Sequence, residues 1–174
     1  MLSQSYPRRR RLRRAALALA GSLPFLAIAL SVSPAKALTR QEAIVVVKLM
    51  QALAPEFGRL AYDEQAADDW FEADAESEGR IAHAGFTRET WRVALGATVT
   101  GYIASLPEAE FRAKLSTIRA RAESGGSLND EQRRAMLALV DEVTARLEAM
   151  RREGIVHVEI IRPLAPRLRV LMVE

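Results

Sequence analysis

The chain contains no cysteine and only two histidines among its 174 residues. The absence of cysteine excludes disulfide bonds, thiolate metal sites and cysteine nucleophiles, so stability must come from packing. The two histidines, His83 and His157, lie in segments with no evident partner spacing. They therefore support neither a zinc site nor a Ser-His-Asp arrangement. No glycine-rich phosphate loop follows a predicted strand either.

Residues 1–37 contain no acidic residue, and their order is typical of a bacterial secretory signal. A run of arginines within residues 8–14 precedes an uncharged, Ala/Leu-rich stretch at residues 15–30. The segment Ser33–Ala37 then supplies small residues at the positions that signal peptidase reads, after a proline that ends any helix. We expect cleavage after Ala37 and a periplasmic or secreted location.

An uncleaved membrane anchor is the alternative, because a spanning helix needs roughly 20 predominantly apolar residues and this stretch, extended to Val32, is only slightly short. The helix breakers Gly21 and Pro24 and the Ala-x-Ala end favour cleavage. The pair Arg13-Arg14 also permits a twin-arginine export route. If the signal is cleaved, the chain contacts a membrane only transiently, through this segment.

Removal of the signal changes the charge balance. The whole chain has 25 basic and 22 acidic residues, and seven of the basic residues lie within residues 1–37. The remaining chain has 18 basic and 22 acidic residues, a net charge of −4. The basic character of the whole chain therefore belongs to the signal, and it predicts no nucleic-acid partner.

The segment Leu38–Glu174 suits one domain with its own core. We expect an all-α fold: a small helical bundle of about five helices, then an irregular, proline-containing tail with a short terminal helix from about Leu164. Pro163 and Pro166 exclude a regular helix through the tail. A strand at Val156–Ile160 is an alternative. The expected helices begin near Thr39, within the acidic stretch from Asp63, and after Thr87, Pro107 and Asn129.

One of these helices carries an unbroken apolar stripe, made of Trp91, Leu95, Val99 and Tyr102 at steps of four, four and three. This spacing predicts a core helix. Glycine costs about 1 kcal/mol relative to alanine in a helix interior, so Gly101 predicts the close approach of a neighbouring helix. The same reasoning applies to Gly96.

The turn at residues 124–127 predicts that the helices on either side form an antiparallel hairpin. The second of them has the a/d seam of a short coiled coil, at Met136, Val140, Val143, Leu147 and Met150. Over two heptads such a seam indicates packing within one bundle more often than dimerisation, so a homodimer is the alternative. If the stripes leave a groove, an exposed apolar area above a few hundred Å² would mark a surface for binding other proteins.

The stretch from Asp63 to Glu78 holds eight acidic residues and no lysine or arginine, with Trp70 and Phe71 as its expected anchors to the core. Within it, Asp74, Glu76 and Glu78 precede Gly79 with the spacing of the first half of a calcium-binding EF-hand loop. The twelfth position of that loop holds Gly85 in place of the bidentate glutamate. Asp74, Glu76 and Glu78 are the candidate metal ligands. The alternative is a solvated acidic face, or one paired with the protein's own arginines.

Leu38-Thr39 directly after the signal, and Leu128-Asn129-Asp130-Glu131-Gln132, resemble the motifs of small periplasmic helical proteins that carry Leu-Thr-x-x-Gln, a family that includes stress chaperones and metal-stress accessory proteins. The chain is also similar to small exported helical proteins of Proteobacteria. It departs from the motif at Glu42, where the family has Gln, and at Asn129, where the family has Thr. Helix capping alone would also explain both motifs. The resemblance implies a chaperone-like or metal-linked role.

We therefore expect an exported, non-enzymatic protein that acts through contacts with an unknown protein or peptide partner and needs no cofactor. The first alternative is a protein that responds to divalent cations through the acidic stretch 63–78. A hydrolase or transglycosylase with a carboxylic acid in that stretch is a further and less favoured alternative.

Overall fold

The computed structural model describes residues 38–61, 65–124 and 129–172, which belong to one compact unit. Among these residues the secondary structure is helical and no strand occurs. The prediction of an all-α fold is confirmed. The predicted signal segment lies outside the described residues. Five helices have 11 or more residues: α1 (Arg40–Phe57), α2 (Ala66–Glu76), α4 (Arg88–Ser105), α5 (Glu108–Glu123) and α6 (Asp130–Glu153).

The remaining elements are short. A single turn, α3, follows α2, and the tail consists of a series of 3-10 and α-helical turns. The tail is irregular as predicted, but it is helical where an extended backbone was expected, and no strand forms at the alternative position. The two tail prolines, Pro163 and Pro166, lie in the first turn of their elements, where the missing N–H is not needed. The short elements are α3 (Arg80–His83), η1 (Gly154–His157), α7 (Val158–Ile161), η2 (Arg162–Leu164) and α8 (Ala165–Leu171).

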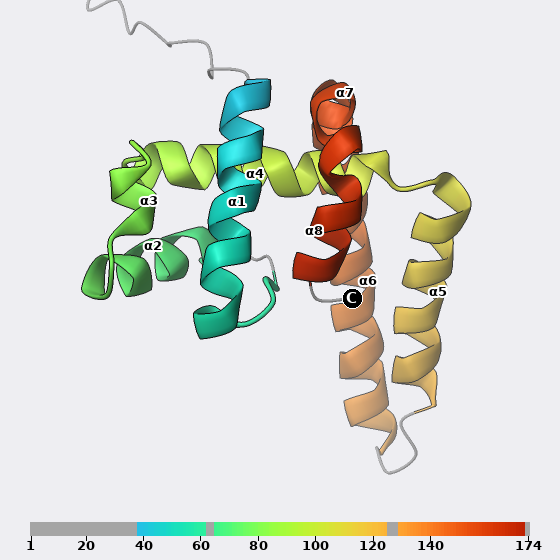
Figure 1. Cartoon of the computed structure of the whole chain (residues 1–174). Coiled ribbons are helices and arrows are strands. Elements are labelled where there is room, and N and C mark those ends of the chain that lie inside the picture. The colour runs from blue at the N-terminus through green and yellow to red at the C-terminus, as the bar shows by residue number, and fades with distance from the viewer. Residues whose placement is uncertain (1–37, 62–64, 125–128, 173–174) are drawn as a thin grey trace, which may run out of the picture. The chain divides into compact units, whose positions relative to one another are not determined.

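Helix α4 is the centre of the core. It contacts α1, α2, α6 and the tail elements η1, α7 and α8, which lie along its length in Figure 1. Its predicted stripe, from Trp91 to Tyr102, is buried. The Trp91 Nε1 donates a hydrogen bond to the carbonyl of Ala67 on α2 at 3.0 Å, which satisfies the one polar atom of this fully buried side chain.

Two glycines allow the tail to cross α4 at backbone contact. A Cβ atom built on Gly154 would lie 2.0 Å from the carbonyl oxygen of Thr100, and one on Gly101 would lie 2.8 Å from Cγ1 of Ile161. Ordinary contacts between carbon atoms are about 3.5–4.0 Å, so neither position accepts a side chain without movement. The close approach predicted from Gly101 is confirmed, and Gly154 makes a second close contact with α4.

Helices α5 and α6 form the predicted antiparallel hairpin (Figure 1). Arg112 pairs with Glu148 at 2.8 Å, and Arg119 pairs with Asp141 at 2.7 Å. A step of seven residues forward along α5 thus matches a step of seven residues back along α6. The far halves of both helices extend past the end of α8 (Figure 1), and the substantial contacts of α6 are confined to α4, α5 and η1.

The last residue of α8 and Met172 after it are hydrogen-bonded to the segment that follows α1. The backbone N–H of Leu60 donates to the carbonyl of Leu171 at 2.8 Å, and the Nε of Arg59 donates to the carbonyl of Met172 at 3.0 Å. Both Leu60 and Met172 are buried. These bonds fix Met172 beside the hairpin, at the edge of the groove described below.

Candidate functional site

The first predicted metal ligand, Asp74, is buried at the end of α2 and organises the turn into α3. Its Oδ2 accepts a hydrogen bond from the backbone N–H of Ile81 at 2.7 Å, and its carbonyl accepts from the N–H groups of Ser77 and Gly79. Its Oδ1 is buried and has no hydrogen-bond partner among the described residues. Asp74 therefore acts as a capping residue for the start of α3.

Glu76 and Glu78, the other two predicted ligands, are exposed and do not join Asp74 in a cluster. Glu78 accepts a hydrogen bond from Arg80 at 2.8 Å, and this bond, with the positive charge of Arg80, lowers the pKa of Glu78. In the part of the chain that the structure describes, no three His, Cys, Asp or Glu side chains are placed to hold a metal ion. Asp63 and Glu64 lie outside that part, and metal binding stays a prediction.

The acidic face of α2 is directed in part at the protein's own arginines. Arg88 on α4 lies 2.7 Å from Glu72, and Arg92 lies 4.0 Å from Asp68. Trp70 is buried as predicted, while Phe71 is half-buried with the guanidinium of Arg88 over its ring at 5.7 Å. Such exposed ion pairs contribute little to stability. They show that part of the negative charge of α2 is paired with arginines of α4.

A groove of about 600 Å³ on the α5–α6 hairpin has the properties of a binding site, and we call it the hairpin groove. Its lining residues come from α4, α5, α6 and α8, from Leu106 between α4 and α5, and from Met172 after α8. This volume is within the range of ligand pockets, which are mostly apolar with a few polar groups at the edge. Most of its lining residues are apolar, among them Val99, Tyr102, Ile103, Leu106, Phe111, Leu115, Ile118, Leu147, Met150 and Met172.

The apolar surface continues beyond the groove along α6. Met136, Leu139 and Val143 have 40%, 53% and 37% of their surface exposed, and we call them the α6 stripe. Val143 precedes the groove residues Leu147 and Met150 by four and seven residues, so helical spacing places the stripe on the same side of α6 as the groove. Apolar side chains that are exposed together on one helix face are a feature of interaction surfaces, whereas single ones need no explanation.

Charged side chains border the groove, and most of them are basic. Lys114 and Arg121 on α5 and Arg169 on α8 line it, with Glu110 as the one acidic residue among its lining residues. Glu110 accepts two hydrogen bonds from Nη2 of Arg169, at 2.9 Å and 3.0 Å. An ion pair between α5 and α8 therefore stands at the edge of the groove, and the excess charge of the lining is positive.

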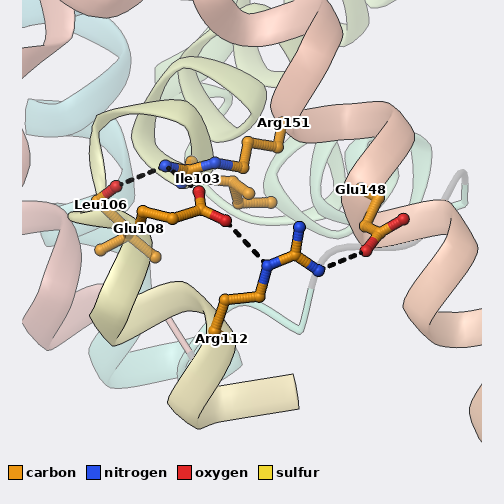
Figure 2. A network of polar contacts seen from close by, with 6 residues as sticks. All are labelled: Ile103, Leu106, Glu108, Arg112, Glu148 and Arg151. Carbon is orange, nitrogen blue, oxygen red and sulfur yellow. Dashed lines mark hydrogen bonds and ion pairs between the residues drawn. The ribbon is translucent and has the colours of Figure 1, made fainter. Parts of the chain in front are cut away.

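Arg151 holds the upper end of the groove in place (Figure 2). Its guanidinium donates to the carbonyls of Ile103 at 2.7 Å and Leu106 at 2.8 Å, where α4 ends and the chain turns into α5. It also lies over the ring of Phe111 at 4.7 Å, and the same ring lines the groove. Arg151 thus supplies charged donors to carbonyls at the end of α4, and the carbonyl of Ile103 also accepts from the N–H of Leu106 at 3.4 Å.

The ion pairs around Arg151 continue to the hairpin. Glu108 lies 3.2 Å from Arg151 and accepts a hydrogen bond from Arg112, which in turn bonds Glu148 on α6 (Figure 2). The bond from Arg112 is the main cause that lowers the pKa of Glu108. The network connects the end of α4 with both helices of the hairpin.

The sequence of α6 indicates an apolar side, but its heptad spacing does not say which of these residues the rest of the protein covers. The a/d seam of α6 was predicted to pack within the bundle, and of its members Val140 and Met150 are buried while Met136 and Val143 are exposed. The run Ala135–Val140 is apolar on every side of the helix. A helix that is apolar all round is normally covered, so this run was the available signal for an unfilled surface.

The chain matches no protein-family model, and neither curated proteins nor solved structures show a significant similarity to it. The resemblance to the Leu-Thr-x-x-Gln family therefore remains a prediction. Among the described residues, no helix combines the length and apolar character that a membrane crossing requires.

Proposed function

We propose that this is an exported protein of non-enzymatic type that acts through protein or peptide contacts, and that the hairpin groove with the α6 stripe is its contact surface. The exposure of Met136, Leu139 and Val143 carries the proposal. Full burial of one such side chain is worth about 1.5–3 kcal/mol, so cover by a partner would recover free energy that folding alone leaves unused. A stress-related or chaperone-like role is consistent with such a surface.

The test is binding of a fluorescent amphipathic peptide to the purified protein, measured by anisotropy. The variant Leu139→Gln with Val143→Thr should weaken binding by at least about tenfold, the effect of losing about 1.4 kcal/mol of apolar contact. Its thermal midpoint should stay close to that of the wild type, because both side chains are exposed. The matched control is Val93→Thr, which removes an apolar group of 48% exposure from α4, away from the groove.

Equal binding by the wild type and the stripe variant would contradict the use of this surface. If the Val93→Thr control weakened binding as much as the stripe variant does, the peptide would be responding to exposed apolar groups in general. That result would also contradict the assignment of binding to this surface. Export and processing have a separate test: mass measurement of the protein recovered from the periplasm should give a chain that begins at Leu38.

The alternative function, response to divalent cations, rests on the buried Oδ1 of Asp74 that has no hydrogen-bond partner among the described residues. A cation that binds only the folded protein, at 100 times its dissociation constant, would add about 2.7 kcal/mol to the free energy of unfolding. Thermal unfolding with and without Ca²⁺ or Zn²⁺ measures this gain. The variant Glu76→Gln with Glu78→Gln should abolish it if these side chains bind the ion, and an unchanged midpoint in the wild type would reject the alternative.

A further inference from the structure

We propose that the segment bound in the hairpin groove is an amphipathic helix of a different protein, with acidic residues along one edge. This inference rests on the proposed function and specifies the partner. Three observations support it: the length of the apolar surface, the lack of a sheet edge in the described residues, and the charge of the groove lining.

The apolar surface has the length and form that suit a helix. From Met136 to the half-buried Leu147 it covers 11 steps along α6, which at 1.5 Å per residue is about 17 Å, or three helical turns. Two antiparallel helices present a valley into which a third helix packs at about 8–10 Å from each. An extended peptide would need a free strand edge, and the described residues have only one isolated bridge, between Leu60 and Met172.

The charge of the lining favours acidic residues on the partner. The groove is lined by three basic residues, Lys114, Arg121 and Arg169, and one acidic residue, Glu110, which is bonded to Arg169. The guanidinium of Arg121 has no hydrogen bond or ion pair with any described residue. Charge complementarity at the edge of an interface increases the association rate and selects among partners.

The spacing of the two α5 cations sets the spacing of the acids. Lys114 and Arg121 are seven residues apart, so two turns, or about 10.5 Å, separate them along α5. Residues seven apart lie on the same side of a helix. A partner helix that runs along α5 would therefore meet both cations with carboxylates at positions i and i+7, beside its apolar face.

A second copy of this chain suits the groove less well. A two-fold interface uses the same surface on both copies, so Lys114 and Arg121 of one copy would face those of the other. Like charges brought together at an interface oppose association. The positive excess therefore argues for a different protein with the opposite charge.

The test compares two synthetic peptides that share one apolar face and differ only at the i and i+7 edge positions, which are Glu in one and Lys in the other. Binding to the purified protein is measured by anisotropy in about 0.1 M and about 1 M salt, between which the Debye length falls from about 10 Å to about 3 Å. The Glu peptide should bind about three- to tenfold more tightly in low salt, the effect of two exposed ion pairs. The preference should shrink in high salt.

The variant Lys114→Gln with Arg121→Gln should remove the preference while keeping the apolar contribution. The matched control is Arg40→Gln with Lys48→Gln, which removes the same charge from exposed positions on α1 and should keep the preference. Circular dichroism of the free peptides confirms that their helix contents are equal.

The outcomes separate the two proposals. If both peptides bind equally, or the Lys peptide binds more tightly, the acidic edge is refuted while the contact surface stands. If neither peptide binds, the proposed function fails as well. A dimer in light scattering that Leu139→Gln dissociates would assign the groove to a second copy. If decanoate displaced the Glu peptide at a concentration below that at which the unlabelled Glu peptide does so, the groove would be assigned to a small amphiphile. Such displacement, or a dimer of this kind, would overturn the inference.

Discussion

The substitution Gly154→Ala tests the crossing of α4 and η1, on which the position of the hairpin depends. The new Cβ atom would lie 2.0 Å from the carbonyl oxygen and 2.2 Å from the carbonyl carbon of Thr100, and 2.8 Å from the amide nitrogen of Gly101. Ordinary contacts need about 3.5 Å, so the two backbones must separate by about 1.5 Å. All three atoms belong to the backbone, so no side-chain rotation relieves the clash.

The magnitude follows from two opposing terms. Overpacking of a core costs about 1–3 kcal/mol and sometimes more, and this clash is at the severe end because a helix must move. Alanine restricts the unfolded chain and regains about 0.4–1 kcal/mol, since the φ of −72° at Gly154 suits any residue. We expect a net loss of about 2–4 kcal/mol in the free energy of unfolding.

Urea unfolding followed by circular dichroism measures this loss, with equal denaturant slopes as a check on two-state behaviour. Gly101→Ala should cost less, because its Cβ atom would meet side-chain carbons of Ile161 and His157 at 2.8 Å and 2.9 Å. The exposed substitution Ala145→Gly should cost about 1 kcal/mol and calibrates the assay. A Gly154→Ala variant within about 0.5 kcal/mol of the wild type, or more stable than Gly101→Ala, would refute the backbone contact.

Two further substitutions and one pH profile test other parts of the fold. Arg151→Met should lower the free energy of unfolding in urea by about 2–4 kcal/mol, because it removes two charge-assisted hydrogen bonds to carbonyls at the end of α4. Arg151→Lys should restore only part of this loss. Trp91→Phe should cost about 1–3 kcal/mol, because the carbonyl of Ala67 loses its donor in the core, and a loss below 0.5 kcal/mol would contradict that role. Burial lowers the pKa of His157 in the folded protein. As pH falls through about 6.5, this histidine therefore gains a proton in the unfolded chain before it does so in the folded one, and the free energy of unfolding should decline below that pH. The decline should disappear in His157→Gln.

Helix starts could be predicted from the sequence because their chemistry is local. Thr39, Thr87 and Asn129 each bond the backbone three residues ahead, and the third residue bonds back, so a window of four residues contains all the partners. The central stripe was equally accessible, since the burial of Trp91 follows from periodicity alone. These features need no knowledge of which elements meet.

The site was less accessible because it depends on contacts between distant segments. A heptad pattern says that one side of α6 is apolar, but it does not say whether a neighbour covers Met136. Gly101 predicts a close approach, but no local pattern reveals that its neighbour is Ile161 of the tail. Asp74 belongs to an acidic run, yet its environment is decided by the N–H of Ile81, seven residues away.

The arrangement of the hairpin explains how it can keep an apolar surface open. The contacts that fix it lie at its base, where Arg151 binds the end of α4, and between its helices, where Arg112 and Arg119 pair across to α6. None of these contacts uses the α6 stripe. The groove is thus formed by interactions that persist without a partner, so a bound helix would not have to supply the ordering of its own site. A partner that binds this surface should therefore raise the unfolding midpoint through occupancy alone, in proportion to the logarithm of its concentration.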